Sequence, residues 1–96
     1  MELVFHPSAA KDARSIGAKY RSISEELYQR FWDELEAGID SIEQHPSSHH
    51  YDPSGMRRYN LKKFPYHILF EERLDSNRIM VIRHHNRNPG FGLRRK

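Results

Sequence analysis

The chain has 96 residues, of which 36% are hydrophobic and 30% charged, with no cysteine and a net charge of +3. A chain of this length is typical of one domain with one modest core, which excludes the large nucleotide-binding folds. The lack of cysteine excludes disulfides and thiolate metal sites. The sequence has no apolar run of membrane-spanning length and no signal-peptide pattern, so we expect a cytoplasmic protein.

Charge is distributed unevenly along the chain. Residues 1–54 carry 5 Lys and Arg against 10 Asp and Glu, a net charge of −5, whereas residues 55–96 carry 11 against 3, a net charge of +8. Such asymmetry indicates that the second half of the chain faces a polyanion or an acidic partner protein. A solvated strand surface with a basic tail is the alternative, and charge alone leaves both open.

The first elements are a strand and a helix. Residues 2–6 form an apolar, β-prone run that predicts a strand ended by Pro7. Proline suits the first position of a helix, because its missing N–H would be unpaired there. Helical spacing of apolar residues predicts an amphipathic helix over residues 7–20. The residues with this spacing are Ala9, Ala13, Ile16 and Tyr20.

A second, longer helix follows. Ser22 and Glu25 have the spacing of a capping box, which predicts a helix start. Apolar residues then recur every three or four positions, and acidic residues fill the remaining surface. The pattern predicts a long amphipathic helix that ends near Gln44 and is closed by Pro46. Its apolar stripe consists of Ile23, Leu27, Phe31, Leu35, Ile39 and Ile42.

The apolar period changes from 3.6 to 2 after a polar loop. Alternating residues predict strands over 57–63 and 66–71. Residues 79–82 are apolar throughout, which predicts a central strand that is covered on both faces. The final segment, about 86–96, is basic and contains Pro and Gly, so we expect a tail whose order depends on a partner.

The expected fold class is α+β, with the order β-α-α-β-β-β in a single domain of residues 1–96. A helical hairpin would bury its apolar stripe on one face of an antiparallel sheet. The other face would then display polar side chains and concentrate positive charge on one wall. The residues expected on this wall are Arg58, Asn60, Lys62 and His67.

Seven histidines raise the question of a metal site. His49-His50 and His84-His85 are adjacent pairs, and adjacent residues of a strand point to opposite faces. The sequence has no HExxH motif and no glycine-rich phosphate loop. We therefore expect no metal and no cofactor.

One cationic constellation remains on the predicted strands and the segment after them. Cleavage of RNA through its own 2′-hydroxyl needs a base, an acid and cations for the developing charge, and His, Arg and Lys supply all three. The same residues could bind phosphates without chemistry, or meet an acidic peptide. The residues alone leave these alternatives open. The constellation consists of Arg58, Lys62, His67, Arg83, His84, His85 and Arg87.

Two segments carry a family resemblance. Residues 57–70 (RRYNLKKFPYHILF) resemble the arginine-rich strand, FPY turn and following strand of the RelE/ParE toxins. Residues 84–89 (HHNRNP) are similar to the His-Gly-Arg-Arg-Asp-Pro segment that closes the ParE-like branch. These are small growth-inhibiting toxins of bacterial type II toxin–antitoxin, or plasmid-stabilisation, systems. The resemblance covers nearly the whole chain and implies the same element order.

The branches of this superfamily imply different activities. The RelE-like branch implies ribosome-dependent mRNA cleavage, with catalytic roles here for Arg58, His67 and Arg87. The ParE-like branch implies a poison of DNA gyrase that catalyses no reaction itself. The Phe64-Pro65-Tyr66 turn and Asn88-Pro89 favour that second branch. The residues expected to bind the target or its phosphates are Arg58, Lys62, Arg83, His84 and Arg87.

The resemblance further implies a cognate antitoxin whose C-terminal segment wraps the toxin. A basic second half would attract an acidic peptide, and Leu69, Ile79 and Val81 on an apolar sheet face would anchor it. A non-toxic nucleic-acid-binding module is a third alternative. It is the least favoured, because the long helix is acidic and no helix offers the basic face needed to read a DNA groove.

Overall fold

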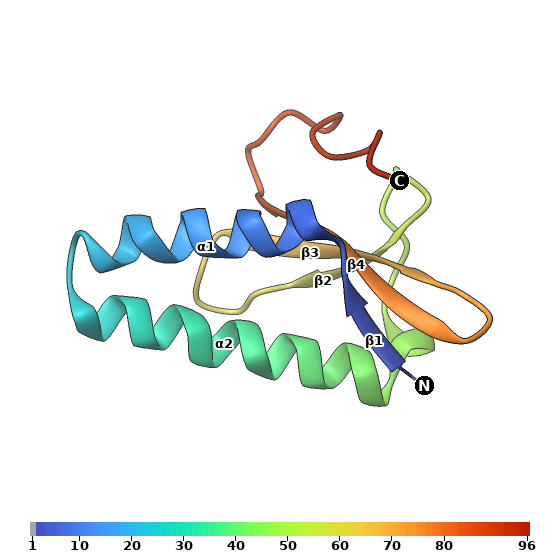
Figure 1. The fold of residues 1–96 in the computed structure, drawn as a ribbon, viewed down its shortest axis with the longest axis horizontal. Coiled ribbons are helices and arrows are strands. Elements are labelled where there is room, and N and C mark those ends of the chain that lie inside the picture. Colours follow the sequence, from blue (N-terminus) through green and yellow to red (C-terminus); the bar gives the residue numbers. More distant parts are fainter. Residues whose placement is uncertain (1) are drawn as a thin grey trace.

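The computed structural model describes residues 2–96, the side chain of Glu2 excepted, and Met1 lies outside the described residues. The observed order confirms the expected β-α-α-β-β-β succession and the α+β class (Figure 1). Within residues 2–96, no helix is both long and apolar enough to cross a membrane. The elements are β1 (Glu2–Phe5), α1 (Pro7–Arg21), α2 (Glu25–Gln44), the 3₁₀ turn η1 (Pro46–Ser48), β2 (Arg57–Asn60), β3 (Tyr66–Glu72) and β4 (Ser76–His84).

The four strands lie in the order β1-β4-β3-β2. β2, β3 and β4 form an antiparallel meander as expected, but β1 pairs parallel with β4, from Glu2 opposite Ser76 to Phe5 opposite Ile79. The expectation of a wholly antiparallel sheet is therefore wrong at this edge. Only His6 separates β1 from α1, so the chain continues onward into α1, and α2 then returns it (Figure 1). β2, β3 and β4 then alternate in direction, so β4 runs in the same direction as β1.

The reversal between the helices is confined to residues 22–24. The hydroxyl of Ser24 accepts a hydrogen bond from Leu27 N–H at 3.0 Å and caps the start of α2. The capping box predicted at Ser22 and Glu25 is wrong, because Ser22 ends α1 and donates its hydroxyl to the carbonyl of Lys19. The serine nearer to α2 is thus its cap.

The apolar stripes of α1 and α2 face the sheet, and the main core lies between the two helices and the sheet. The Phe31 ring packs against those of Tyr20 and Tyr66, at centroid distances of 5.5 and 6.2 Å. Gly38 lets α2 approach β2 closely, since a Cβ at this position would lie 2.7 Å from the Tyr59 ring. The buried core residues are Ala9, Ala13, Ile16, Phe31, Leu35, Ile42, Leu61, Tyr66, Ile68, Phe70, Ile79 and Ile82.

β4 is apolar on both faces and contains a β-bulge. Leu69 pairs with Val81, but Phe70 pairs with Ile79, so Met80 is an extra residue of β4. Ile79 therefore packs in the core beneath the helices, whereas Leu69, Met80 and Val81 form a second cluster. We refer to these three residues as the second-face cluster. The prediction of a central strand covered on both faces is confirmed.

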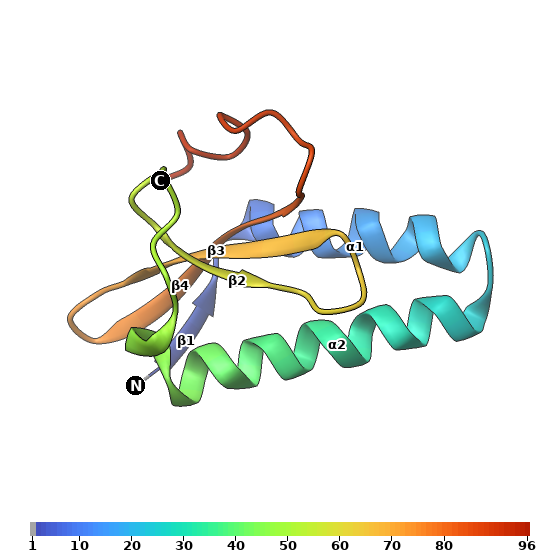
Figure 2. The same cartoon turned by 180° about the vertical axis from the view of Figure 1, so that it is seen from behind.

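The C-terminal segment covers this second face. The Phe91 ring and the Met56 side chain pack against the second-face cluster. Arg83 Nη1 donates to the carbonyls of Pro89 and Phe91 at 2.7 and 3.1 Å, and Arg95 reaches back to α1. The tail, expected to depend on a partner for its order, is held instead by its own chain, on the side away from α2 (Figures 1 and 2).

Candidate functional site

Five polar residues meet on the second face of the sheet, and we refer to them as the polar cluster. Arg58 comes from β2, His67 from β3 and Arg83 from β4, and His67 pairs directly with Arg83 in the sheet register. Asp52 comes from the loop before β2, and His85 directly follows β4. The sheet thus assembles side chains that lie far apart in the sequence.

Asp52 is the acidic member of the polar cluster. Its Oδ1 accepts a hydrogen bond from Arg58 Nη1 at 3.1 Å, and its Oδ2 lies 3.8 Å from Arg83 Nη2. Burial alone would raise the pKa of Asp52, but hydrogen bonds from Ser54 and Arg58, with the charge of Arg83, hold that pKa below its ordinary value. Sequence reasoning misses Asp52, because Asp-Pro in a polar loop is typical of a turn.

His67 is buried and neutral. Its Nε2 accepts a hydrogen bond from Arg83 Nε at 2.9 Å, and its Nδ1 lies 2.9 Å from Nδ1 of His85. Arginine is always a donor, so the ring proton of His67 is on Nδ1 and is donated to His85. Burial, with the charges of Arg58 and Arg83, lowers the pKa of His67 to about 4. Burial and Arg58 also lower the pKa of His85, so both rings are neutral at pH 7.

This arrangement is a poor centre for acid–base catalysis. A catalytic acid or base must reach its substrate and exchange a proton near neutral pH. His67 is 2% exposed, and both of its ring nitrogens are occupied. Arg87, the third residue of the nuclease expectation, lies elsewhere, with its guanidinium 4.2 Å from the Phe91 ring centroid. The contacts of Arg58 and His67 are those of a structural network.

The structure divides the residues expected to bind a target among three places. Arg58 and Arg83 belong to the polar cluster, where Asp52 offsets part of their charge. Lys62 lies in the turn after β2, in a depression that α2 also lines, and so on the helical side of the sheet. His84 and Arg87, with Arg83, line a groove beside α1.

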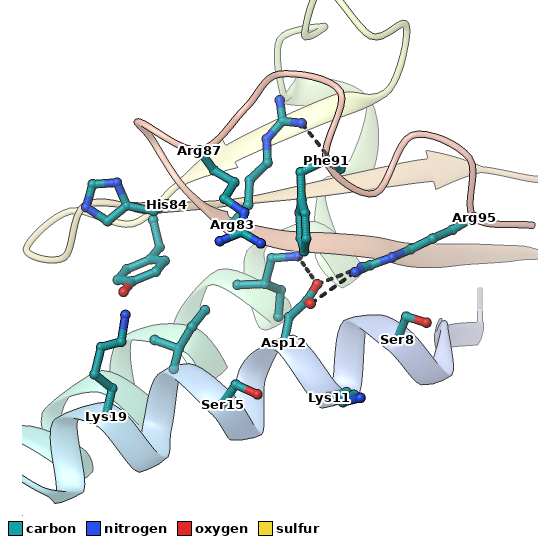
Figure 3. A pocket seen from close by; sticks show the side chains of 13 residues that line it. Ser8, Lys11, Asp12, Ser15, Lys19, Arg83, His84, Arg87, Phe91 and Arg95 are labelled. Carbon is teal, nitrogen blue, oxygen red and sulfur yellow. Dashed lines mark hydrogen bonds and ion pairs between the residues drawn. The ribbon is translucent and has the colours of Figure 1, made fainter.

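This groove lies between α1 and the C-terminal tail and has a volume of about 510 Å³. We refer to it as the basic groove. Lys11 and Lys19 line it from α1, so this helix does offer a basic face, contrary to the expectation from the sequence. Lys19 and His84 lie at one end of the groove, and Ser8 and Arg95 at the other (Figure 3).

The residues expected to anchor an antitoxin are all fully buried. Leu69 and Val81 belong to the second-face cluster, beneath Phe91. Ile79 lies on the opposite face, in the core, because the bulge at Met80 changes the alternation of β4. The expectation that the three residues share one apolar face is therefore wrong for Ile79.

Among residues 2–96, no three His, Asp or Glu side chains are grouped so as to hold a metal ion. The helical hairpin on a four-strand sheet, with cations gathered on and beside the second face, defines a small α+β protein of the RelE/ParE toxin type. A solved structure of the chromosomal ParDE TA system from P. aeruginosa has this fold, with a TM-score of 0.74 at 19% sequence identity. The match covers 88% of this chain and 95% of that chain.

The amino-acid sequence assigns the chain to a particular family. Residues 3–89 match the family model of the ParE toxin of type II toxin-antitoxin system, parDE. The chain therefore belongs to the ParE toxin family and is a toxin of a type II toxin–antitoxin system. No curated protein matches the chain in sequence. The resemblance inferred from residues 57–70 and 84–89 is confirmed, with the ParE-like branch that they favoured.

Proposed function

We propose that this toxin inhibits bacterial growth in the cytoplasm by binding and poisoning DNA gyrase, without catalysing a reaction itself. The observation that carries the proposal is the match of residues 3–89 to the ParE toxin family. Within the superfamily, the ParE-like branch is the one whose resemblance implies gyrase, and the RelE-like branch implies mRNA cleavage.

The polar cluster supports binding over catalysis. His67 donates to His85 and accepts from Arg83, and its pKa of about 4 keeps it uncharged. Arg58 is held by Asp52 at 3.1 Å and donates to Asn60 Oδ1 at 2.7 Å. A side chain so fully engaged positions its neighbours, and it is poorly placed to move a proton on a bound substrate.

We test this proposal with the purified chain in two parallel assays. We expect the chain to abolish DNA supercoiling by gyrase and to accumulate cleaved DNA, while a ribosome-based translation reaction proceeds normally. In cells, induction without antitoxin should lower thymidine incorporation before amino-acid incorporation. An earlier fall in amino-acid incorporation, with cleavage of ribosome-bound mRNA, would instead establish the RelE-like nuclease.

The variant His67→Gln separates the two activities. A glutamine amide can still accept a hydrogen bond from Arg83 and donate one to His85, so we expect the fold to be kept. A gyrase poison should then retain its inhibition, whereas a nuclease that uses His67 as acid or base should lose about two orders of magnitude or more in rate. Circular dichroism of the variant checks that it is folded.

We also propose a cognate antitoxin with an acidic, partly apolar binding segment. The net charge of +8 in residues 55–96 would attract it, and Leu69 and Val81 remain its proposed anchors. Ile79 leaves this proposal because it lies in the core. Phe91 packs against the cluster that contains both anchors, so antitoxin binding there displaces the tail. Faster hydrogen exchange of residues 88–96 in the complex is the expected result, and unchanged exchange would contradict it.

A further inference from the structure

The basic groove has an excess of cations that the protein itself does not neutralise. Its lining holds five Lys and Arg side chains and one carboxylate, Asp12. Arg95 donates to both oxygens of Asp12, at 2.6 and 3.1 Å, and thereby offsets its charge. Within residues 2–96, Lys11, Lys19 and Arg87 form no ion pair. An anion that enters the groove therefore meets three available cations and no available carboxylate.

The cations and hydroxyls of α1 form a row along the groove. Ser8, Lys11, Ser15 and Lys19 recur at intervals of three and four residues, which places them on one face of the helix. From Ser8 to Lys19 the row spans about 16 Å at the rise of an α-helix. Alternating cations and hydroxyls at this spacing suit a chain of anionic groups better than a single small anion.

The opposite wall adds aromatic surface. The half-buried Phe91 ring has Arg87 at 4.2 Å and Arg95 at 5.1 Å from its centroid. The His84 ring packs against Tyr66 with centroids 5.1 Å apart. Cationic grooves that also contain aromatic rings are typical of single-stranded nucleic-acid binding, because bases stack on the rings while cations follow the backbone.

We propose that the basic groove binds the phosphodiester backbone of single-stranded DNA. An acidic peptide fits less well, because a peptide that folds on binding needs apolar anchors. The aliphatic lining residues, Ile16 and Ile82, are only 9% and 1% exposed. The choice of DNA over RNA rests on the proposed function, since gyrase acts on DNA. The proposed affinity for a phosphodiester backbone does not rest on the proposed function.

The experiment measures the binding of the whole chain to fluorescein-labelled oligo-dT by anisotropy over a series of salt concentrations. Contacts from Lys11, Lys19 and Arg87 predict a slope of about −2 for log K against log salt, at about −0.7 per contact. The double variant Lys11→Gln/Lys19→Gln should reduce the slope to about −0.7. The control Lys63→Gln/Arg73→Gln removes the same charge from two exposed turns outside the groove and should keep the wild-type slope.

Three results would overturn the proposal: no binding of oligo-dT, equal losses in the two double variants, or equally tight binding of oligo-glutamate. Tighter binding of oligo-U than of oligo-dT would overturn the choice of DNA. The supercoiling assay separates this proposal from the proposed function. Gyrase inhibition without binding of oligo-dT refutes only the groove, and binding without gyrase inhibition refutes only the gyrase target and, with it, the reason for choosing DNA.

Discussion

At the scale of single residues, His67 links the register of the sheet to the chemistry of the polar cluster. Its position opposite Arg83 gives it a permanent hydrogen-bond donor on Nε2, and the adjacent His85 accepts its remaining proton. A histidine on an exposed strand face would be free to titrate near pH 6.5. Burial and the close approach of two arginines keep this one neutral.

The lowered pKa of His67 predicts a dependence of stability on pH. The unfolded chain binds a proton at its ordinary pKa of 6.5, and the folded chain only at about 4. The contribution of His67 to the free energy of unfolding is therefore complete above pH 6.5 and lost as pH falls toward 4, by about 3 kcal/mol in total. Urea unfolding over this range should show a shallower slope for His67→Gln than for wild type.

The control for this measurement is His45→Gln. His45 is exposed, at the end of α2, so we expect this variant to follow the wild-type curve. Equal pH slopes for His67→Gln and wild type would show that His67 is charged in the folded protein, and would contradict its assignment as a neutral structural residue.

Asp52 carries a second prediction at this scale. The variant Asp52→Asn leaves Arg58 and Arg83 close together without a carboxylate, and removal of one partner of a buried ion pair is strongly destabilising. We expect a loss of about 2–3 kcal/mol in the free energy of unfolding, below the fully buried case because Arg58 is partly exposed. Because the pKa of Asp52 is lowered, its contribution is present above about pH 3.9 and is lost as the folded carboxylate protonates.

Denaturant unfolding at neutral pH measures this loss. The matched control Asp75→Asn changes the same charge in the exposed turn before β4 and should alter stability by no more than about 0.5 kcal/mol. Similar values for the two variants would mean that the polar cluster does not depend on its carboxylate.

At the scale of elements, the tail and β4 depend on one glycine. Gly92 has φ +82°, a conformation that side chains rarely adopt, and a Cβ there would lie 2.6 Å from Val81 Cγ2. The position therefore requires glycine both for its backbone angle and for the close approach of the tail to the second-face cluster. A tail ordered only by a partner would need neither.

Two alanine variants separate these requirements. Gly55 also has a positive φ, of +92°, but no atom within 4 Å of its would-be Cβ. Gly55→Ala should therefore cost about 1 kcal/mol from backbone strain alone, and Gly92→Ala about 2–3 kcal/mol from strain and overpacking. Unfolding gives the difference, and faster hydrogen exchange in residues 88–96 should appear only in Gly92→Ala. Equal costs would show that the tail does not pack on Val81.

The limits of the helices and strands show how much of this structure the local sequence pattern determines. The apolar spacing predicts the last residue of α2, Gln44, and the stripe faces the core from Phe31 onward, but Ile23 lies before the helix and is exposed. The helix start was misplaced because Ser22 and Ser24 both suit a cap, and only the observed reversal of the chain decides between them. The bulge at Met80 leaves no sign in a run of four apolar residues, so the position of Ile79 could not be predicted.

At the scale of the whole molecule, the charge asymmetry of the sequence becomes an arrangement of surfaces. The acidic residues lie on α2, whereas the basic groove lies between α1 and the tail, which is on the side of the molecule away from α2 (Figures 1 and 3). The tail completes a third layer over the sheet, after the helices and the strands. Its contacts with Arg83 and with the second-face cluster make it part of the folded structure.

Deletion of residues 89–96 tests this layer. Removal of Phe91 exposes the second-face cluster, and Arg83 loses two carbonyl acceptors. We expect a loss of about 2–4 kcal/mol in the free energy of unfolding and new binding of the dye ANS. The control Arg94→Gln, at an exposed tail position, should change neither. Unchanged stability and no dye binding in the truncated chain would contradict a structural role for the tail.

The sequence by itself determined the element order, the helical stripes, the central position of residues 79–82 and the toxin family. These properties are encoded in spacing between neighbours and in two contiguous motifs. Only the tertiary structure decided that β1 runs parallel to β4, that Asp52 joins Arg58 and Arg83, and that α1 and the tail form one groove. Each depends on contacts between residues far apart in the chain, which local periodicity does not record.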